Sequence, residues 1–429
     1  MLNIYDPNVR QHLLEGNFGL EKENLRILGD GRLSHSPHPF PDHKYIVRDF
    51  CENQTEINTG VHKSIDGAID ELSSHTNRIR SLLLQLPDPE YLWPFSNPPY
   101  IENDRDIPVA SFDGVEVSKT AYRNYLAEKY GKYKMTFSGI HVNFSFSEAL
   151  IAAARDAALR AGEDTGETET DFKNRLYLDL AQKMMANGWI LVAATAASPL
   201  LDSSYVEKGI FGESVFTGMA SVRCSEMGYW NEFAPVLDYT DIRAYTESIN
   251  HYVETGLLKA PSELYYPIRL KPPGENTLGN LCRHSVNHIE LRMYDLNPYA
   301  PAGVNPRDIA FAQLLMVWLA SSPPVFLSGR KQIQAAANYK NAARYDLKTV
   351  NMMTENGAIS IADAALETIR QMRTFYDGLG IDTSAVLDFQ QRKFEDADFR
   401  YAWRIRKEYR NNFVETALAQ LKQGSIVYV

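Results

Sequence analysis

The segment IHVNFSF, from Ile140 to Phe146, alternates strictly between apolar and polar side chains. This two-residue period is that of a strand with one face in a core and the other in water. The segments HIELR (residues 288–292) and LEKENLRI (residues 20–27) divide their side chains in the same way. We therefore predict an α+β fold, in which helices back one face of an antiparallel sheet and the other face turns toward a wet cavity.

Helical periodicity separates these strands. After Ser64, an expected N-cap, apolar positions from Ile65 to Leu86 fall on one helical face until Pro87 ends the pattern. We expect further helices over residues 118–130, 190–197, 309–320 and 399–421, and an exposed loop over the acidic stretch 162–170.

Bulk properties exclude several classes of protein. The formal net charge of -10 disfavours a nucleic-acid binder, which needs a basic face. Three widely spaced cysteines indicate neither a disulfide framework nor a zinc site. The start of the chain is charged, and the apolar runs are shorter than the roughly 18 residues of a membrane span. We expect a cytoplasmic protein with no membrane partner.

Two pairs of acidic residues are candidate cation ligands. Glu21 and Glu23 lie two residues apart on an expected strand, so their carboxylates project to one side about 7 Å apart. Asp49 and Glu56 fall on opposite faces under strict alternation, so both reach one cavity only if a bulge or turn intervenes. Taken singly, either pair is better explained as solvated surface charge.

Two further strands carry candidate ligands. His141 shares the polar face of its strand with Asn143 and Ser145, although a lone histidine is more often structural. Glu290 and Arg292 share a face and could simply pair with each other, a contact worth little when exposed. The functional alternative is a metal-holding glutamate beside a guanidinium that clamps a phosphoryl group.

If these acids share one cavity, they require cations. Each pair of like charges about 4 Å apart costs on the order of 4 kcal/mol at an effective dielectric constant of 20. Carboxylate oxygens with at most one imidazole favour Mg²⁺, or Mn²⁺, over zinc. The sequence contains neither a Walker motif nor a complete GxGxxG, so a bound ATP would be held through metal ions and arginines.

Eight ordered motifs resemble the bacterial glutamate–cysteine ligase family, including the ligase half of fused glutathione synthetases. They are GLEKENLR, DF-E---E (residues 49–56), WPFSNPPYI, YRNYLAEKYG, SGIHVNFS, SVRCSEMGY, ELYYPIR and HIELRMYDLNPYAPAGV. The resemblance implies a glutamine-synthetase-like antiparallel sheet curled into a funnel and backed by helices. It implies an ATP- and Mg²⁺-dependent reaction, in which glutamate is phosphorylated on its gamma-carboxylate and an amine captures the gamma-glutamyl phosphate.

The resemblance also implies roles for individual residues. The metal positions are matched by Glu21, Glu23, Asp49, Glu56, His141 and Glu290, and the arginine that steadies the transferring phosphoryl group is matched by Arg292. Arg223 matches an arginine that binds a substrate carboxylate, and Asn143 follows His141 as expected. Positions around the amino-acid acceptor are matched by Phe50, Tyr122, Arg123, Leu126, Tyr229 and Tyr265.

Two departures leave the acceptor open. Met135 stands where the family commonly has glutamine, and Val142 replaces an aromatic residue. The expected reaction joins L-glutamate to L-cysteine, the first step of glutathione synthesis. The alternatives are a gamma-glutamyl ligase with another amine, since a thioether accepts a thiol or a more apolar group, and a non-catalytic relative that binds nucleotide or glutamate.

Past about Ser321 the sequence matches little of the family. We expect a single catalytic domain over residues 1–429, with a helical portion from about 305, acting as a monomer on small molecules without a second ATP-grasp domain. A basic cluster near the end is expected to be a solvated helical face; it comprises Arg400, Arg404, Arg406, Lys407 and Arg410.

Overall fold

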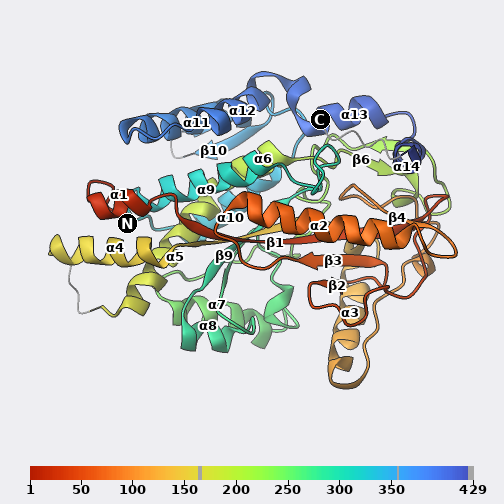
Figure 1. Ribbon diagram of the computed structural model, residues 1–429, viewed down its shortest axis with the longest axis horizontal. Helices are drawn as coiled ribbons and strands as arrows, with labels where there is room; N and C mark the ends of the chain where they lie inside the picture. Colours follow the sequence, from red (N-terminus) through yellow and green to blue (C-terminus); the bar gives the residue numbers. More distant parts are fainter. Residues whose placement is uncertain (163–166, 355–356, 424–429) are drawn as a thin grey trace.

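A seven-stranded antiparallel sheet organises the computed structural model, which describes residues 1–162, 167–354 and 357–423 (Figure 1). The strand order is β2-β3-β1-β5-β9-β8, and β4 pairs with the far end of β1. Its strands are β1 (Gly16–Leu28), β2 (Ile46–Arg48), β3 (Gln54–Asn58), β4 (Glu90–Leu92), β5 (Ile140–Phe146), β8 (Ile268–Lys271) and β9 (His288–Tyr294). Two small hairpins pair β6 (Leu200–Asp202) with β7 (Ser214–Phe216) and β10 (Asn351–Thr354) with β11 (Gly357–Ser360).

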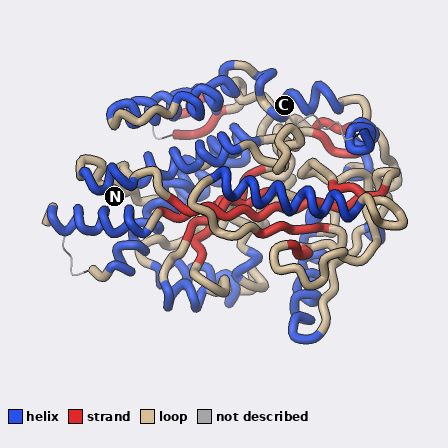
Figure 2. The backbone as a smooth tube through the Cα atoms, viewed as in Figure 1, coloured by secondary structure: helices blue, strands red, loops and turns tan. Residues whose placement is uncertain are grey.

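Helices surround this sheet (Figure 2). In the first half of the chain they are α1 (Pro7–His12), α2 (Ile65–Leu83), α3 (Val117–Tyr130), α4 (Glu148–Arg160), α5 (Glu169–Asn187) and α6 (Trp189–Thr195). In the second half they are α7 (Ile242–Glu254), α8 (Leu278–His284), α9 (Pro306–Ala320), α10 (Gly329–Ala342), α11 (Ile361–Gly378), α12 (Ser384–Glu395), α13 (Tyr401–Tyr409) and α14 (Phe413–Gln423). In the part of the chain that the structure describes, every helix is too short or too polar to cross a bilayer.

The alternating pattern separates the two faces of the sheet as predicted. Ile57, Val142 and Leu291 lie on one face, where each is at most 1% exposed within the main hydrophobic core. Helices α2, α5 and α6 contact the sheet, and the apolar α9 packs against all three of them. The predicted α+β class with an antiparallel sheet is confirmed, and the sheet does not close into a barrel.

A turn resolves the conflict between Asp49 and Glu56. Asp49 directly follows β2, and its N–H donates to the carbonyl of Gln54 at 3.1 Å across the turn that leads into β3. Val47 pairs with Glu56 in the same hairpin. The register therefore places Asp49 and Glu56 on one face of two antiparallel neighbours, rather than on two faces of one strand.

An irregularity between β5 and β9 lies beside His141. The register shifts between the pairs Ile140–Tyr294 and Val142–Leu291, so β9 holds an extra residue at this point. Such bulges re-aim side chains and are common next to active sites. Arg292 lies at this bulge and lines the same cavity as Glu290 and His141.

The C-terminal segment differs from its prediction. A single helix over residues 399–421 is wrong, because the chain breaks between α13 and α14. The Asn412 side chain accepts the N–H of Glu415 and so starts a new helix. Ser214 bridges the break, since its hydroxyl donates to the Tyr409 carbonyl and accepts the N–H of Phe413.

The basic cluster and the acidic loop also need correction. Arg400 is only 5% exposed and donates to the Tyr345 carbonyl, while Arg404 and Arg406 lie over the rings of Tyr299 and Phe216. Only the remainder of the cluster is exposed, so a fully solvated face is wrong. Residues 163–166 of the expected acidic loop lie outside the described residues, and α5 already begins at Glu169.

A buried polar cluster joins the C-terminal helices to α9. Asp308 is 1% exposed and accepts the Lys393 ammonium at 2.6 Å. The hydroxyl of Tyr401 and the amide of Gln390 donate to the same carboxylate, each at 2.8 Å. Because these partners come from α12 and α13, the cluster ties the end of the chain to the core under the sheet.

We expect Lys393→Met to lower the free energy of unfolding by about 3 kcal/mol, because it leaves the Asp308 carboxylate buried without its cation. Urea denaturation followed by circular dichroism measures this loss, and Lys407→Met at an exposed position of α13 is the matched control. The predicted single domain requires one cooperative transition. Equal stability of the two variants would contradict the role assigned to the cluster.

Candidate active site

The polar face of the sheet lines one cavity of about 400 Å³. Strands β1, β3, β5, β8 and β9, helix α3 and several loops contribute its walls, and every predicted site residue except Asn143 lines it. The Asn143 amide instead donates to Glu21 Oε1, one of the lining carboxylates, at 2.9 Å. The structure thus brings together residues far apart in the sequence, and their individual roles stay predictions.

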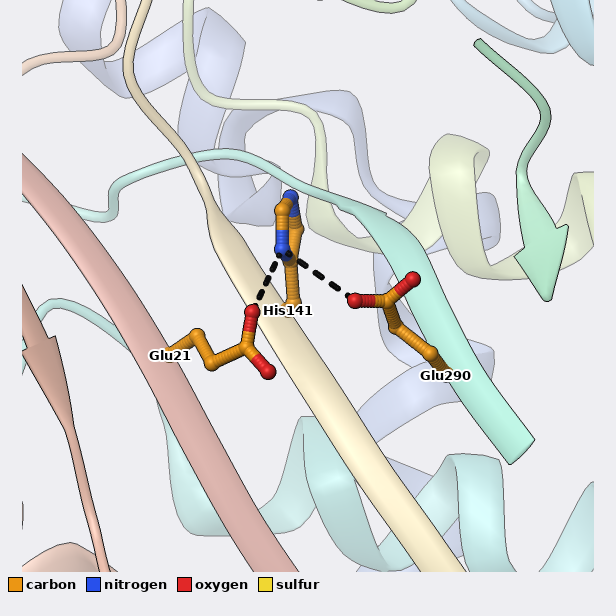
Figure 3. Close-up of side chains that lie close together, drawn as sticks. All are labelled: Glu21, His141 and Glu290. Carbon is orange, nitrogen blue, oxygen red and sulfur yellow. Dashed lines mark hydrogen bonds and ion pairs between the residues drawn. The ribbon is translucent and has the colours of Figure 1, made fainter. Parts of the chain in front are cut away.

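Glu21, His141 and Glu290 form a compact group of potential ligands on β1, β5 and β9 (Figure 3). Each offers a donor atom, and these atoms all lie within 4.8 Å of one another. His141 Nδ1 lies 3.1 Å from Glu21 Oε2 and 3.7 Å from Glu290 Oε1. Burial and the charge of Arg292 lower the pKa of His141, which favours the neutral imidazole that binds metals.

Glu290 is a fully buried carboxylate with cations on both oxygens. Arg292 Nη1 donates to Oε2 at 3.1 Å, and Lys271 Nζ lies 3.1 Å from Oε1. Burial alone would raise the pKa of Glu290, but the charges of Arg292, Lys271 and His141 hold it well below the usual range. Glu290 is therefore ionised and already compensated within the protein.

A second acidic group lies beside the first, on β1, β3 and the turn after β2. Burial and the charge of Asp49 raise the pKa of Glu23 to about 8. Burial, Asp49 and the two strand glutamates Glu21 and Glu23 raise the pKa of Glu56 well above its usual value. In the absence of a cation, protons thus relieve part of the repulsion in this group.

Arg223 lies against the strand that carries His141. Its Nη1 donates to the carbonyls of Arg292 and Tyr294, while its Nε is buried without a hydrogen-bond partner. A side chain at Gly139 would collide with this guanidinium, which explains the glycine in the SGIH motif. The Gly139 N–H also donates to Glu23 at 2.9 Å, so this residue, just before β5, contacts both charged groups.

Aromatic and apolar side chains form the other wall. Phe50, Leu126 and Met135 are each at most 6% exposed and belong to one hydrophobic cluster. The rings of Tyr229 and Tyr265 lie 5.5 Å apart between this cluster and the acids. This wall suits the apolar part of a small substrate, and it contains Met135 where the family commonly has an amide.

Glu263 fastens α3 to the segment that carries Tyr265. Its buried carboxylate accepts Lys129 Nζ at 2.6 Å and the Tyr130 hydroxyl at 2.7 Å, both from the last turn of α3. Arg123 on the same helix donates to the backbone carbonyl of Asp49 rather than to an acidic side chain. These contacts hold α3 over the cavity, although Figure 1 shows it as a projecting arm.

Sequence reasoning missed several lining residues, of which Lys271 is the charged one deepest in the acidic region. The ELYYPIR motif contained a usable signal, because alternation along β8 places Lys271 on the same face as Arg269. Without the register, nothing indicated that this face adjoins Glu290. Trp230, Tyr266 and Ser262 also line the cavity without having been predicted.

Comparison with known proteins identifies the relatives of this chain. A sequence model of the glutamate–cysteine ligase family matches residues 1–257 and 235–342. The chain belongs to the glutamate–cysteine ligase family. The glutathione biosynthesis bifunctional protein GshAB of Listeria monocytogenes is 35% identical over 97% of this chain and 55% of its own length.

Solved structures of family members share the fold. A bifunctional glutathione synthetase from Pasteurella multocida superimposes with a TM-score of 0.82 at 26% identity, over 99% of this chain and 54% of that one. The glutamate–cysteine ligase of Francisella tularensis, solved in complex with AMP, has the same TM-score at 22% identity, over 96% of this chain and 89% of that one. The chain spans about half the length of the bifunctional relatives.

The donor set of this glutamate–cysteine ligase family member fits Mg²⁺ or Mn²⁺. Carboxylate oxygens dominate it, with a single imidazole from His141. Burial and neighbouring carboxylates raise the pKa values of Glu23 and Glu56, so these two side chains favour a nearby cation when they are ionised. Divalent cations would stabilise the ionised carboxylates and displace the protons.

We expect the metal-free protein to lose stability as the pH rises from about 4.5, the ordinary pKa of Glu23, to about 8. The folded state binds a proton in this window that the unfolded state has released, so the free energy of unfolding falls with pH. Thermal unfolding in EDTA across pH 5 to 8 measures the slope. Glu23→Gln should flatten it, and Mn²⁺ should reverse it; a wild-type slope that Glu23→Gln leaves unchanged would refute the assignment.

Proposed function

We propose that this protein is an ATP- and Mg²⁺-dependent ligase that joins the gamma-carboxylate of L-glutamate to the amine of L-cysteine. The observation that carries the proposal is the position of Arg292, which bonds to Glu290 and lines the cavity that the other acids share. Phosphoryl transfer depends mainly on charge neutralisation and alignment. The cavity offers charge neutralisation and alignment, and the membership of this chain in the glutamate–cysteine ligase family agrees with this chemistry.

In the proposed reaction, one half of the cavity binds the metal ions and phosphates and the other half binds the acceptor. Glu21, Glu23, Asp49, Glu56, His141 and Glu290 would hold the divalent ions, which neutralise the phosphates of ATP. Arg292 steadies the transferring phosphoryl group, and Arg223, with its unpartnered buried Nε, binds a carboxylate of the substrate. The acidic half thus holds the phosphates, and the aromatic half holds the acceptor.

Two displacements complete the proposed reaction. An oxygen of the gamma-carboxylate of glutamate attacks the terminal phosphorus of ATP, and the bond to ADP breaks. The acceptor amine then attacks the carbonyl carbon of the gamma-glutamyl phosphate, an amide bond forms, and inorganic phosphate leaves with the bonding electron pair. The amine gives up a proton as the amide forms. Water must be excluded during these steps. Helix α3 would do so, because its residues Tyr122, Arg123 and Leu126 line the cavity.

A second candidate function differs only in the acceptor. Met135 is 5% exposed, lies in the apolar cluster with Phe50 and Leu126, and offers only a thioether where an amide would offer hydrogen bonds. This wall accommodates a more apolar side chain as readily as the thiol of cysteine. A gamma-glutamyl ligase with another amine therefore stays an alternative.

We also propose that the protein acts in the cytoplasm, as a monomer, on small molecules. Its three cysteines are unpaired, and two of them are buried, which suits a reducing compartment. The cavity of about 400 Å³ matches small ligands rather than a macromolecule.

We expect Arg292→Ala to lower kcat about a thousandfold, because it removes a charge that stabilises the transferring phosphoryl group. Glu290→Gln should cause a comparable loss, since it weakens metal binding and frees Arg292. ADP release measures both, with Arg243→Ala on the exposed face of α7 as the matched control. Turnover within tenfold of wild type in Arg292→Ala would contradict the proposed role of this arginine.

An acceptor panel tests the reaction itself. The protein is incubated with ATP, Mg²⁺ and glutamate and then offered cysteine, other amino acids and simple amines, with ADP and product measured. We expect cysteine to be the best acceptor, and Met135→Gln to raise selectivity for it over apolar amino acids. Strong ADP release with another amine and none with cysteine would favour the second candidate. No ADP with any acceptor would overturn the ligase proposal in favour of a binding protein.

A further inference from the structure

Lys271 is a cation in the cavity to which the proposed reaction gives no role. It ends β8, and its side chain is 13% exposed and lines the cavity. Its ammonium lies 3.1 Å from Oε1 of the fully buried Glu290. Lys271 therefore forms an ion pair with Glu290 and lies at the edge of the acidic group.

The ammonium lies where it would conflict with a metal ion. Glu290 Oε1 is the oxygen that also faces His141 Nδ1, at 3.7 Å, within the group of potential ligands (Figure 3). A lysine ammonium and a divalent cation on the same carboxylate oxygen repel each other. Lys271 and a metal ion therefore compete for the same oxygen.

Lys271 differs in this respect from the neighbouring cations. Arg269, two residues earlier on the same strand face, is fixed by hydrogen bonds to the backbone carbonyls of Ser262 and Leu264. Arg292 is bound to the other oxygen of Glu290, away from this conflict. The Lys271 side chain is a flexible four-carbon stem with a point charge, and the open cavity adjoins it.

We propose that Lys271 is a stand-in cation, which neutralises Glu290 in the metal-free protein and passes to the phosphates of the nucleotide when a metal ion takes its place. The ammonium leaves one anion and gains another, so the charge of the cavity stays balanced at each stage. Lys271 is thus a positioning residue that couples metal binding to nucleotide binding. This inference rests on the proposed function, because it takes a nucleoside triphosphate as the phosphate ligand.

The coupling predicts that Lys271→Met strengthens the binding of Mn²⁺ and weakens the binding of the nucleotide. Without nucleotide, Mn²⁺ should bind about tenfold more tightly, since its competitor is gone. A non-hydrolysable ATP analogue, added with saturating Mn²⁺, should bind about tenfold more weakly, because a phosphate contact is lost. Electron paramagnetic resonance titration of free Mn²⁺ measures the first effect, and calorimetry measures the second.

Two further variants separate contact from general charge. Lys119→Met removes a cation from the rim of the same cavity, where Lys119 pairs with Glu116 and is 51% exposed in its side chain. It should leave both dissociation constants within about twofold of wild type, because exposed charges are screened. Lys271→Gln also removes the charge of Lys271 but keeps a polar side chain, so it serves as the test variant if Lys271→Met does not fold.

The outcomes separate this inference from the proposed function. Unchanged or weaker Mn²⁺ binding in both neutral variants, or equal tightening in Lys119→Met, would overturn the stand-in role, as would unchanged binding of the ATP analogue. Opposite shifts in the two dissociation constants would support it. A purely structural lysine would lower thermal stability without tightening Mn²⁺ binding. The acceptor panel alone decides the ligase reaction, since it does not depend on Lys271.

Discussion

Repulsion among buried carboxylates is the constraint on which the site depends. Acidic side chains from β1, β3, β9 and the turn after β2 face one cavity. Like charges a few ångströms apart repel each other, and together they oppose folding by several kcal/mol. The metal-free protein relieves this repulsion in two ways. Protons neutralise part of the Glu23 and Glu56 group, whereas Arg292 and Lys271 compensate Glu290. Under the proposed function, metal ions would replace both kinds of compensation.

The sheet makes this concentration of charge possible because its two faces are independent. Ile57, Val142 and Leu291 bury the opposite face, which stabilises the strands that carry the acids. Lys22 is an exception to the apolar character of the buried face. It lies between Glu21 and Glu23 in the sequence, but its side chain is buried on the core face, where its amine donates to the Thr76 hydroxyl at 3.2 Å. Burial and the charge of Arg80 lower the pKa of this amine well below its usual value, because the core disfavours its charged form.

The two halves of the cavity differ in how firmly they are built. Strand register fixes the acidic half, because all the expected metal ligands except Asp49 lie on hydrogen-bonded strands. The acceptor half depends on α3, which reaches the rest of the protein through the buried Glu263 and through Arg123 on the Asp49 carbonyl. Helical cover of this kind can adjust to an acceptor without disturbing the ligands.

The sequence by itself determined the strand faces, the family and most of the cavity residues. Alternation is a local property, so Ile140 to Phe146 specified which side chains point to the core and which do not. It could not show that Asp49 and Glu56 share a face, because a turn decides that, nor that the last helix breaks at Asn412. The contact between Lys271 and Glu290 was equally hidden, since it depends on the register between β8 and β9. Which charges meet is set by strand pairing across long sequence separations, and only the tertiary structure decides it.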